Sequence, residues 1–204
     1  MYTMANIEKA TKVGILNYAK INNIVDVYEN NGKIKRTYQV SQELPQKDAE
    51  EFKAEIQACF EEYKVSPEAK GKKFDDRFPA RLGYEEKDGK TLFKFWTFSE
   101  YKATDTKPAT KKVIPVFEVG KGPLGEKNIG NGSKGQVAYE LHPFWGSSSV
   151  FGVSLIMNKV LVHELIEFGG SSDDMSVFGV DVSGANGVFS DATKSDIPEE
   201  KILF

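Results

Sequence analysis

The sequence predicts a mostly β protein: an antiparallel, closed or nearly closed barrel that carries one amphipathic helix and ends in a flexible acidic tail. Three observations support this fold class. Several β-rich runs are separated by turn residues, one stretch alone has helical spacing, and the apolar runs stop near residue 170. We therefore divide the chain into one domain, residues 1–170, and a mobile tail, residues 171–204.

The first half should form two strands and a helix. The strands are expected at 13–21 and 33–40, joined by a turn at residues 30–32, where asparagine and glycine tolerate positive φ. Pro45 then opens a helix from Gln46 to about Tyr63, because apolar residues recur there at three- and four-residue spacing. Charged residues cover its other face, so the helix should lie on a sheet.

The second half should be β-rich. Residues 64–80 are polar and predict a loop, and a Lys-Asp-Gly-Lys turn then joins two strands into a hairpin. Pro115 suggests that the strand around it lies at a sheet edge. The remaining strands are expected at 81–86, 91–98, 113–119, 136–145 and 151–168.

Charge is distributed unevenly along the chain, whose net charge is −3. Residues 171–204 hold seven acidic and two basic side chains, net −5, so residues 1–170 carry about +2 by difference. Residues 71–136 hold 14 basic and nine acidic side chains, net +5. An anionic tail on a basic body indicates a body that binds an anion, and a tail that binds something else or competes for that site.

Several classes of protein are disfavoured. No apolar run approaches the length of a membrane span, and the first residues do not resemble a signal peptide, so we expect a cytoplasmic protein without a membrane partner. Cys59 is the single cysteine, which excludes an internal disulfide and suits a reducing compartment. His142 and His163 lie far from it, so we expect no structural zinc, no other metal and no cofactor.

The hairpin at 81–98 is the strongest candidate for a binding surface. On an extended strand Phe93 and Phe95 point to one face, whereas Lys94, Trp96 and Phe98 point to the other. A strand buried on both sides would explain these rings without a ligand. A strand with one face in the core and one offering rings to nucleobases explains them equally well, and a lysine among the rings favours binding.

Basic side chains surround this hairpin in the expected loops and turns. A cationic groove lined with rings is what a single-strand binder needs, because phosphates attract cations and splayed bases stack on aromatic faces. The alternative is an ordinary solvated, lysine-rich surface. The candidate DNA contacts are Arg81, Lys94, Trp96, Phe98, Lys111 and Lys112, with Tyr84 and Trp145 as second choices and Lys72, Lys73 and Arg77 as further cations.

Enzyme signatures are weak, so we expect a protein that is not an enzyme. The segment 120–125 resembles a phosphate-binding loop only superficially, because Pro123 interrupts it and no helix follows. Asp75 and Asp76 could hold Mg²⁺, but nothing nearby completes a two-metal site. Two alternatives stay open: a small metal-dependent nuclease, and a structural or virion protein whose rings form a subunit interface.

The chain also resembles a known family, the phage single-stranded-DNA-binding (helix-destabilising) proteins with an OB-type fold. The resemblance lies in the stretches 112–116, 129–133, 151–155 and 160–169, which include a Gly-Asn-Gly-Ser turn before the last strands, and in an acidic tail that ends in an aromatic residue. It implies an OB-like barrel that binds single-stranded DNA in replication, recombination and repair, in the host cytoplasm if the chain is phage-encoded.

The resemblance also implies a role for the tail. Asp196, Glu199, Glu200 and Phe204 would bind a replicative polymerase or helicase, and the tail would lie in the empty DNA groove until DNA displaces it. The sequence leaves the oligomeric state open, with a homodimer as one state that it allows.

Overall fold

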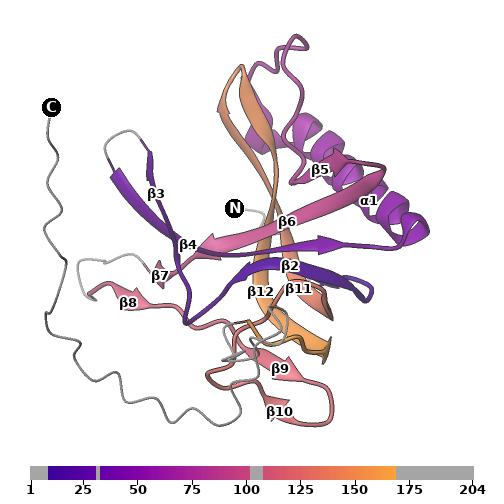
Figure 1. Ribbon diagram of the computed structural model, residues 1–204. Coiled ribbons are helices and arrows are strands. Elements are labelled where there is room, and N and C mark those ends of the chain that lie inside the picture. Colours follow the sequence, from indigo (N-terminus) through magenta and orange to yellow (C-terminus); the bar gives the residue numbers. More distant parts are fainter. Residues whose placement is uncertain (1–8, 31–32, 102–107, 169–204) are drawn as a thin grey trace, which may run out of the picture. The chain divides into compact units, whose positions relative to one another are not determined.

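The computed structural model describes residues 9–30, 33–101 and 108–168, and these contain one α-helix, one short 3-10 helix and twelve strands (Figure 1). The helices are α1 (Gln46–Val65) and η1 (Pro67–Ala69). The strands are β1 (Lys9–Ala10), β2 (Gly14–Lys20), β3 (Asp26–Asn30), β4 (Lys33–Glu43), β5 (Tyr84–Lys87), β6 (Lys90–Phe98), β7 (Glu100–Tyr101), β8 (Thr110–Lys111), β9 (Val116–Glu118), β10 (Gly122–Pro123), β11 (Ser133–Ser147) and β12 (Val150–Glu164).

Five strands of the main sheet form a ring. The pairings run from β11 through β2, β4 and β6 to β12, which returns to β11 along a long hairpin. Most pairings are antiparallel, while β12 runs parallel to β6 and β9. The ring does not close as a continuous barrel, because β6 and β12 share only two residue pairs and β2 and β11 only three. The predicted mostly β fold with one helix is confirmed.

Helix α1 covers the core side of this sheet (Figure 1). It begins after Pro45, as expected, and its buried residues recur at three- and four-residue spacing. The Phe52 ring lies 4.7 Å from that of Phe93 on β6 and 4.8 Å from that of Tyr139 on β11. One helical side chain therefore ties two strands of the ring together.

Two expectations about the strands were wrong. Strands β2 and β4 pair, but β3 lies between them in the sequence and forms the hairpin with β4, which extends from the sheet (Figure 1). The sequence of β3 is rich in polar residues, so its strand character was missed. Strand β9 lies between β12 and β10, so it is not at a sheet edge. Pro115 does not disturb this pairing, because it precedes the strand and its carbonyl accepts the N–H of Val160 (3.0 Å).

Gly152 permits a close backbone contact between β12 and the segment before β5. Its neighbours Phe151 and Val153 exchange hydrogen bonds with the backbone of Arg81, at 2.9 and 2.8 Å. A Cβ atom at position 152 would lie 1.9 Å from the Arg81 carbonyl oxygen. No side chain fits at that separation, so this contact requires glycine.

Gly152→Ala should lower the free energy of unfolding by about 1–3 kcal/mol, because the added methyl group forces two backbones apart. Urea denaturation measures the change. Gly146→Ala in the same hairpin is the matched control, since its Cβ would meet nothing closer than 3.4 Å. Equal stabilities for the two variants would contradict the close contact.

Candidate nucleic-acid interface

Strand β6 separates the core from an exposed face. Phe93 and Phe95 are fully buried, whereas Trp96 is half-buried and Lys94 and Phe98 are exposed on the opposite face. The expected alternation of the strand is therefore confirmed, with one face in the core and one available for binding.

The exposed face of β6 forms one wall of an open groove with a volume of about 620 Å³. Strands β2, β3, β4 and β5 contribute the other walls. Its lining residues are Tyr18, Asp26, Tyr28, Thr37, Gln39, Val40, Ser41, Glu85, Lys87, Leu92, Lys94, Phe95 and Trp96.

Four aromatic side chains lie in or beside the groove. Trp96 and Phe98 make an edge-to-face contact with ring centroids 5.2 Å apart. Tyr18 is 63% exposed and Tyr28 is 40% exposed. Open rings on a groove surface are the platforms on which unpaired bases stack. Neither tyrosine was among the candidates from the sequence.

Tyr18 has an unusual backbone conformation. Its φ is 52°, a left-handed conformation that is uncommon for a bulky residue. The N–H of Tyr18 donates to Asn131 Oδ1 (2.7 Å), and Asn17 Oδ1 accepts from the N–H of Gly132 (3.2 Å). The Gly-Asn-Gly-Ser turn noted in the sequence therefore holds the segment that carries Tyr18.

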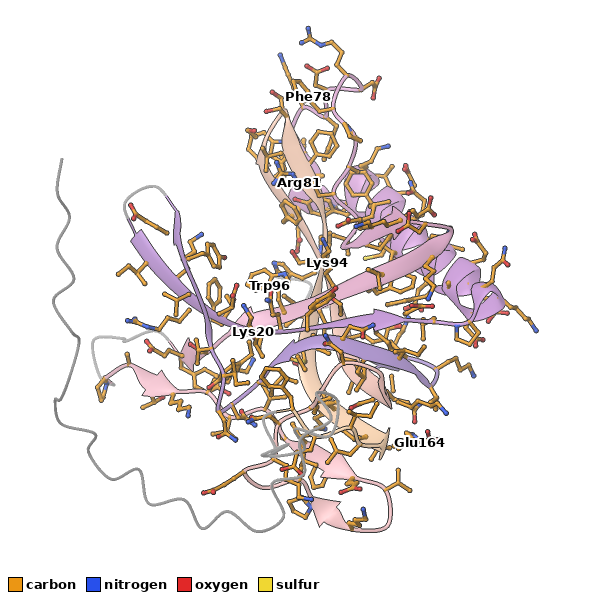
Figure 2. The ribbon with its side chains drawn as sticks, in the orientation of Figure 1. Lys20, Phe78, Arg81, Lys94, Trp96 and Glu164 are labelled. Atoms are coloured by element: carbon orange, nitrogen blue, oxygen red, sulfur yellow. The ribbon has the colours of Figure 1, made fainter. Side chains whose placement is uncertain are left out.

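Two lysines form ion pairs at the groove: Lys94, which lines it, and Lys20, which lies beside it. Lys94 donates to Glu85, and Lys20 donates to Asp26 across the β2–β3 connection. The hydrogen bond from Lys94 holds the pKa of Glu85 below its usual value. Figure 2 shows Lys20 and Lys94 on either side of Trp96. The groove thus combines rings with cations that carboxylates partly neutralise.

Arg81 lies next to this group. Its backbone is held against β12, and the carbonyl of Gly83, two residues later, accepts the N–H of Lys94 (2.8 Å). The Arg81 side chain is exposed and makes no ion pair with the described residues. Phe78, 44% exposed, lies farther along the same segment (Figure 2). This segment offers a cation and a ring beyond the groove.

Other predicted cations are engaged locally. Lys72 lies over the Tyr63 ring of α1, 5.0 Å from its centroid. Arg77 makes a two-pronged contact with Asp75 (3.0 and 2.7 Å), which lowers the pKa of that carboxyl group. Both belong to the connection after α1 and do not line the groove. Asp75 is thereby occupied, and the described residues contain no group of three or more His, Cys, Asp or Glu that could hold a metal ion.

The two second-choice rings also lie outside the groove. Trp145 donates its indole N–H to the carbonyl of Lys73 (2.9 Å), which fastens the connection after α1 to the β11–β12 hairpin. The Lys73 side chain itself is exposed. Tyr84 packs against the core residue Phe93, with ring centroids 5.7 Å apart.

Lys111 and Lys112 lie near the end of β6 but away from its groove face. Lys112 donates to Thr97 Oγ1 (2.8 Å) and lies 5.9 Å from the Tyr101 ring centroid. The Thr97 side chain is buried on the face opposite Trp96. Lys111 is exposed on β8, in register with Glu100. These two lysines therefore are not brought together with Lys94.

The tail candidates Asp196, Glu199, Glu200 and Phe204 lie outside the described residues. In the part of the chain that is described, no helix is long and apolar enough to cross a membrane.

No protein-family model matches the chain. Among curated proteins, the single-stranded DNA-binding protein of Escherichia phage T7 is 32% identical over 159 residues, covering 70% of this chain and 68% of that protein. The protein of the same name from Enterobacteria phage T3 is 32% identical over 123 residues, covering 57% and 53%.

Two solved structures share the fold. The crystal structure of the T7 protein matches with a TM-score of 0.61 and 24% identity over 89% of this chain and all of that one. The single-stranded DNA-binding protein of bacteriophage Enc34, in complex with single-stranded DNA, matches with a TM-score of 0.53 and 11% identity over 79% and 88%. These likenesses confirm the expected OB-type fold. The relatives are binding proteins, which agrees with the expectation that the chain is not an enzyme. The chain belongs to the family of phage single-stranded DNA-binding proteins.

Proposed function

We propose that the chain binds single-stranded DNA without sequence preference, through the groove beside β6, and acts in phage DNA replication and recombination. The observation that carries this proposal is the proximity of Tyr18, Trp96 and Lys94 on one open face. Every base has a face that can stack on a ring, and every phosphate can meet a cation. A surface built from these two contacts is tolerant of sequence.

The magnitude of stacking supports this assignment. Each base on an aromatic platform contributes about 1–3 kcal/mol. Trp96, Phe98, Tyr18 and Tyr28 are available as platforms. Each phosphate that a lysine neutralises adds a salt-dependent contribution. Lysines then orient the strand and make its binding sensitive to salt.

Arg81 would extend the path beyond the groove, because its side chain is exposed beside the backbone of Lys94 and Gly83. The other candidates stay predictions: Lys111 and Lys112 around the end of β6, Tyr84 on β5, and Lys72, Lys73, Arg77 and Trp145 near the tip of the β11–β12 hairpin. A strand that leaves the groove would have to bend to reach them.

The tail is proposed as a second functional unit. Residues 1–170 would form the DNA-binding domain, and residues 171–204, with net charge −5, would bind a replicative polymerase or helicase in the host cytoplasm. The acidic side chains and Phe204 support this role by their chemistry. The same charge would let the tail compete with DNA for a cationic surface.

Tryptophan fluorescence should report binding through one residue. Trp96 and Trp145 are the two tryptophans of the chain, and the Trp145 indole is already bound to a carbonyl. Adding oligo-dT should lower the emission of Trp145→Phe by about the same absolute intensity as that of the unaltered protein. The emission of Trp96→Phe should barely change. The reverse pattern would place the DNA strand at the tip of the β11–β12 hairpin and away from the groove.

Tyr18→Ala should weaken binding to oligo-dT by about five- to 100-fold, because it removes one stacking platform. The side chain is 63% exposed, so folding should be unaffected. Phe117→Ala is the matched control, since Phe117 is an exposed ring on β9 outside the groove. Fluorescence anisotropy measures both affinities, and equal losses would refute a role for the groove.

Deleting residues 171–204 should tighten binding at low salt, because a competing anionic segment is removed. The gain should shrink as salt rises and screening weakens the competition. The slope of log affinity against log salt should increase by about 0.7 for each additional phosphate that is neutralised. Unchanged affinity at all salt concentrations would remove the competition model.

A further inference from the structure

We propose that Glu85 and Asp26 are built-in competitors for the DNA phosphates. In the free protein they occupy Lys94 and Lys20, and a bound strand must displace them. This inference rests on the proposed function, because it concerns the regulation of the same groove.

The geometry places both carboxylates inside the binding surface. Glu85 and Asp26 line the groove itself, on β5 and β3. Glu85 accepts a hydrogen bond from Lys94 and Asp26 accepts one from Lys20, so the two ion pairs lie on strands at opposite sides of the groove. The charged residues of the lining are Asp26, Glu85, Lys87 and Lys94, two acids and two bases. The groove therefore presents less positive charge than its lysines alone would give.

The two ion pairs are exposed to solvent, so a ligand can break them. The side chains of Lys94 and Glu85 are 55% and 50% exposed, and those of Lys20 and Asp26 are 40% and 26% exposed. Water and salt screen such pairs, so each contributes little to stability and can be broken. A phosphate carries at least as much charge as a carboxylate and can replace it at the ammonium group. Each exchange still costs one broken ion pair, which lowers the net gain.

Because the carboxylates weaken its electrostatic attraction, a DNA strand in the groove binds by stacking and dissociates readily. A protein that coats transient single strands must release them when another protein needs them. Carboxylates in the groove reduce the electrostatic part of the affinity without removing the cations that orient the strand. Glu85 and Asp26 thus limit affinity where Trp96 and Tyr18 supply it.

The test replaces each acid by its neutral isostere in the full-length protein. Glu85→Gln and Asp26→Asn should each tighten binding to oligo-dT by about three- to tenfold at low salt, since a like charge near the phosphates is removed. Glu164→Gln is the control: it makes the same charge change and frees Lys134, but it lies at the end of β12, outside the groove (Figure 2). The control should change affinity by less than about twofold.

A double-mutant cycle separates competition from simple repulsion. If Glu85 occupies Lys94, Lys94→Ala should cost more affinity in the Glu85→Gln background than in the unaltered protein, by about two- to fivefold. Additive effects would show that Glu85 repels DNA without holding the lysine, which would overturn the proposal.

The outcomes also separate this proposal from the proposed function. If the unaltered protein does not bind oligo-dT at low salt, the proposed function fails. If it binds, and Glu85→Gln and Asp26→Asn behave like Glu164→Gln, only the competition is refuted. Circular dichroism of each variant confirms that the fold is retained.

Discussion

Strand β6 serves the core and the groove at once, and the rest of the structure depends on its two-residue period. Phe93 and Phe95 are fully buried, and Lys94 and Trp96 between and beyond them face the groove. A slip by one residue against β4 would bury the lysine and expose the phenylalanines. The burial of two aromatic rings therefore fixes which side chains of β6 face the groove.

Two walls of the groove are stabilised differently. The wall that β6 forms is backed in the core by the contact of Phe52 with Phe93. On the wall that β2 forms, Tyr18 adopts a left-handed conformation that a hydrogen bond from its N–H to Asn131 Oδ1 supports. The first wall therefore depends on apolar packing, and the second on polar contacts of the backbone.

The sequence was sufficient to predict those features that depend on the periodicity of residues within one helix or strand. The limits of α1, the β5–β6 hairpin and the alternation of β6 all follow from spacing within one element. Lys94, Trp96 and Phe98 were found for this reason. Tyr18 and Tyr28 were not found, because one lies at a break in strand geometry and the other on a strand with a polar sequence. Both reach the groove only through tertiary pairing.

The same limit applies to three predicted cations that do not line the groove. Lys112, Lys72 and Arg77 are close to the hairpin in sequence, yet they contact Thr97, Tyr63 and Asp75 and not the groove. Their partners lie on the far face of a strand, on a helix and within the same turn. Spacing along one strand does not predict such contacts. Those of Lys112 and Lys72 depend on where the chain returns after a loop, and that of Arg77 is set within its own turn.

Charge counted along the sequence also differs from charge presented in space. Residues 71–136 carry net +5, yet Lys94 of that segment is paired with Glu85 in the groove. Lys20, beside the groove, is paired with Asp26. Glu85 comes from β5, which pairs with β6, and Asp26 comes from β3, a strand that the sequence did not predict. The electrostatic field at the groove is therefore set by which acids the fold brings to the lysines. Under the competition proposed above, Lys94 and Lys20 become available to phosphates as Glu85 and Asp26 release them.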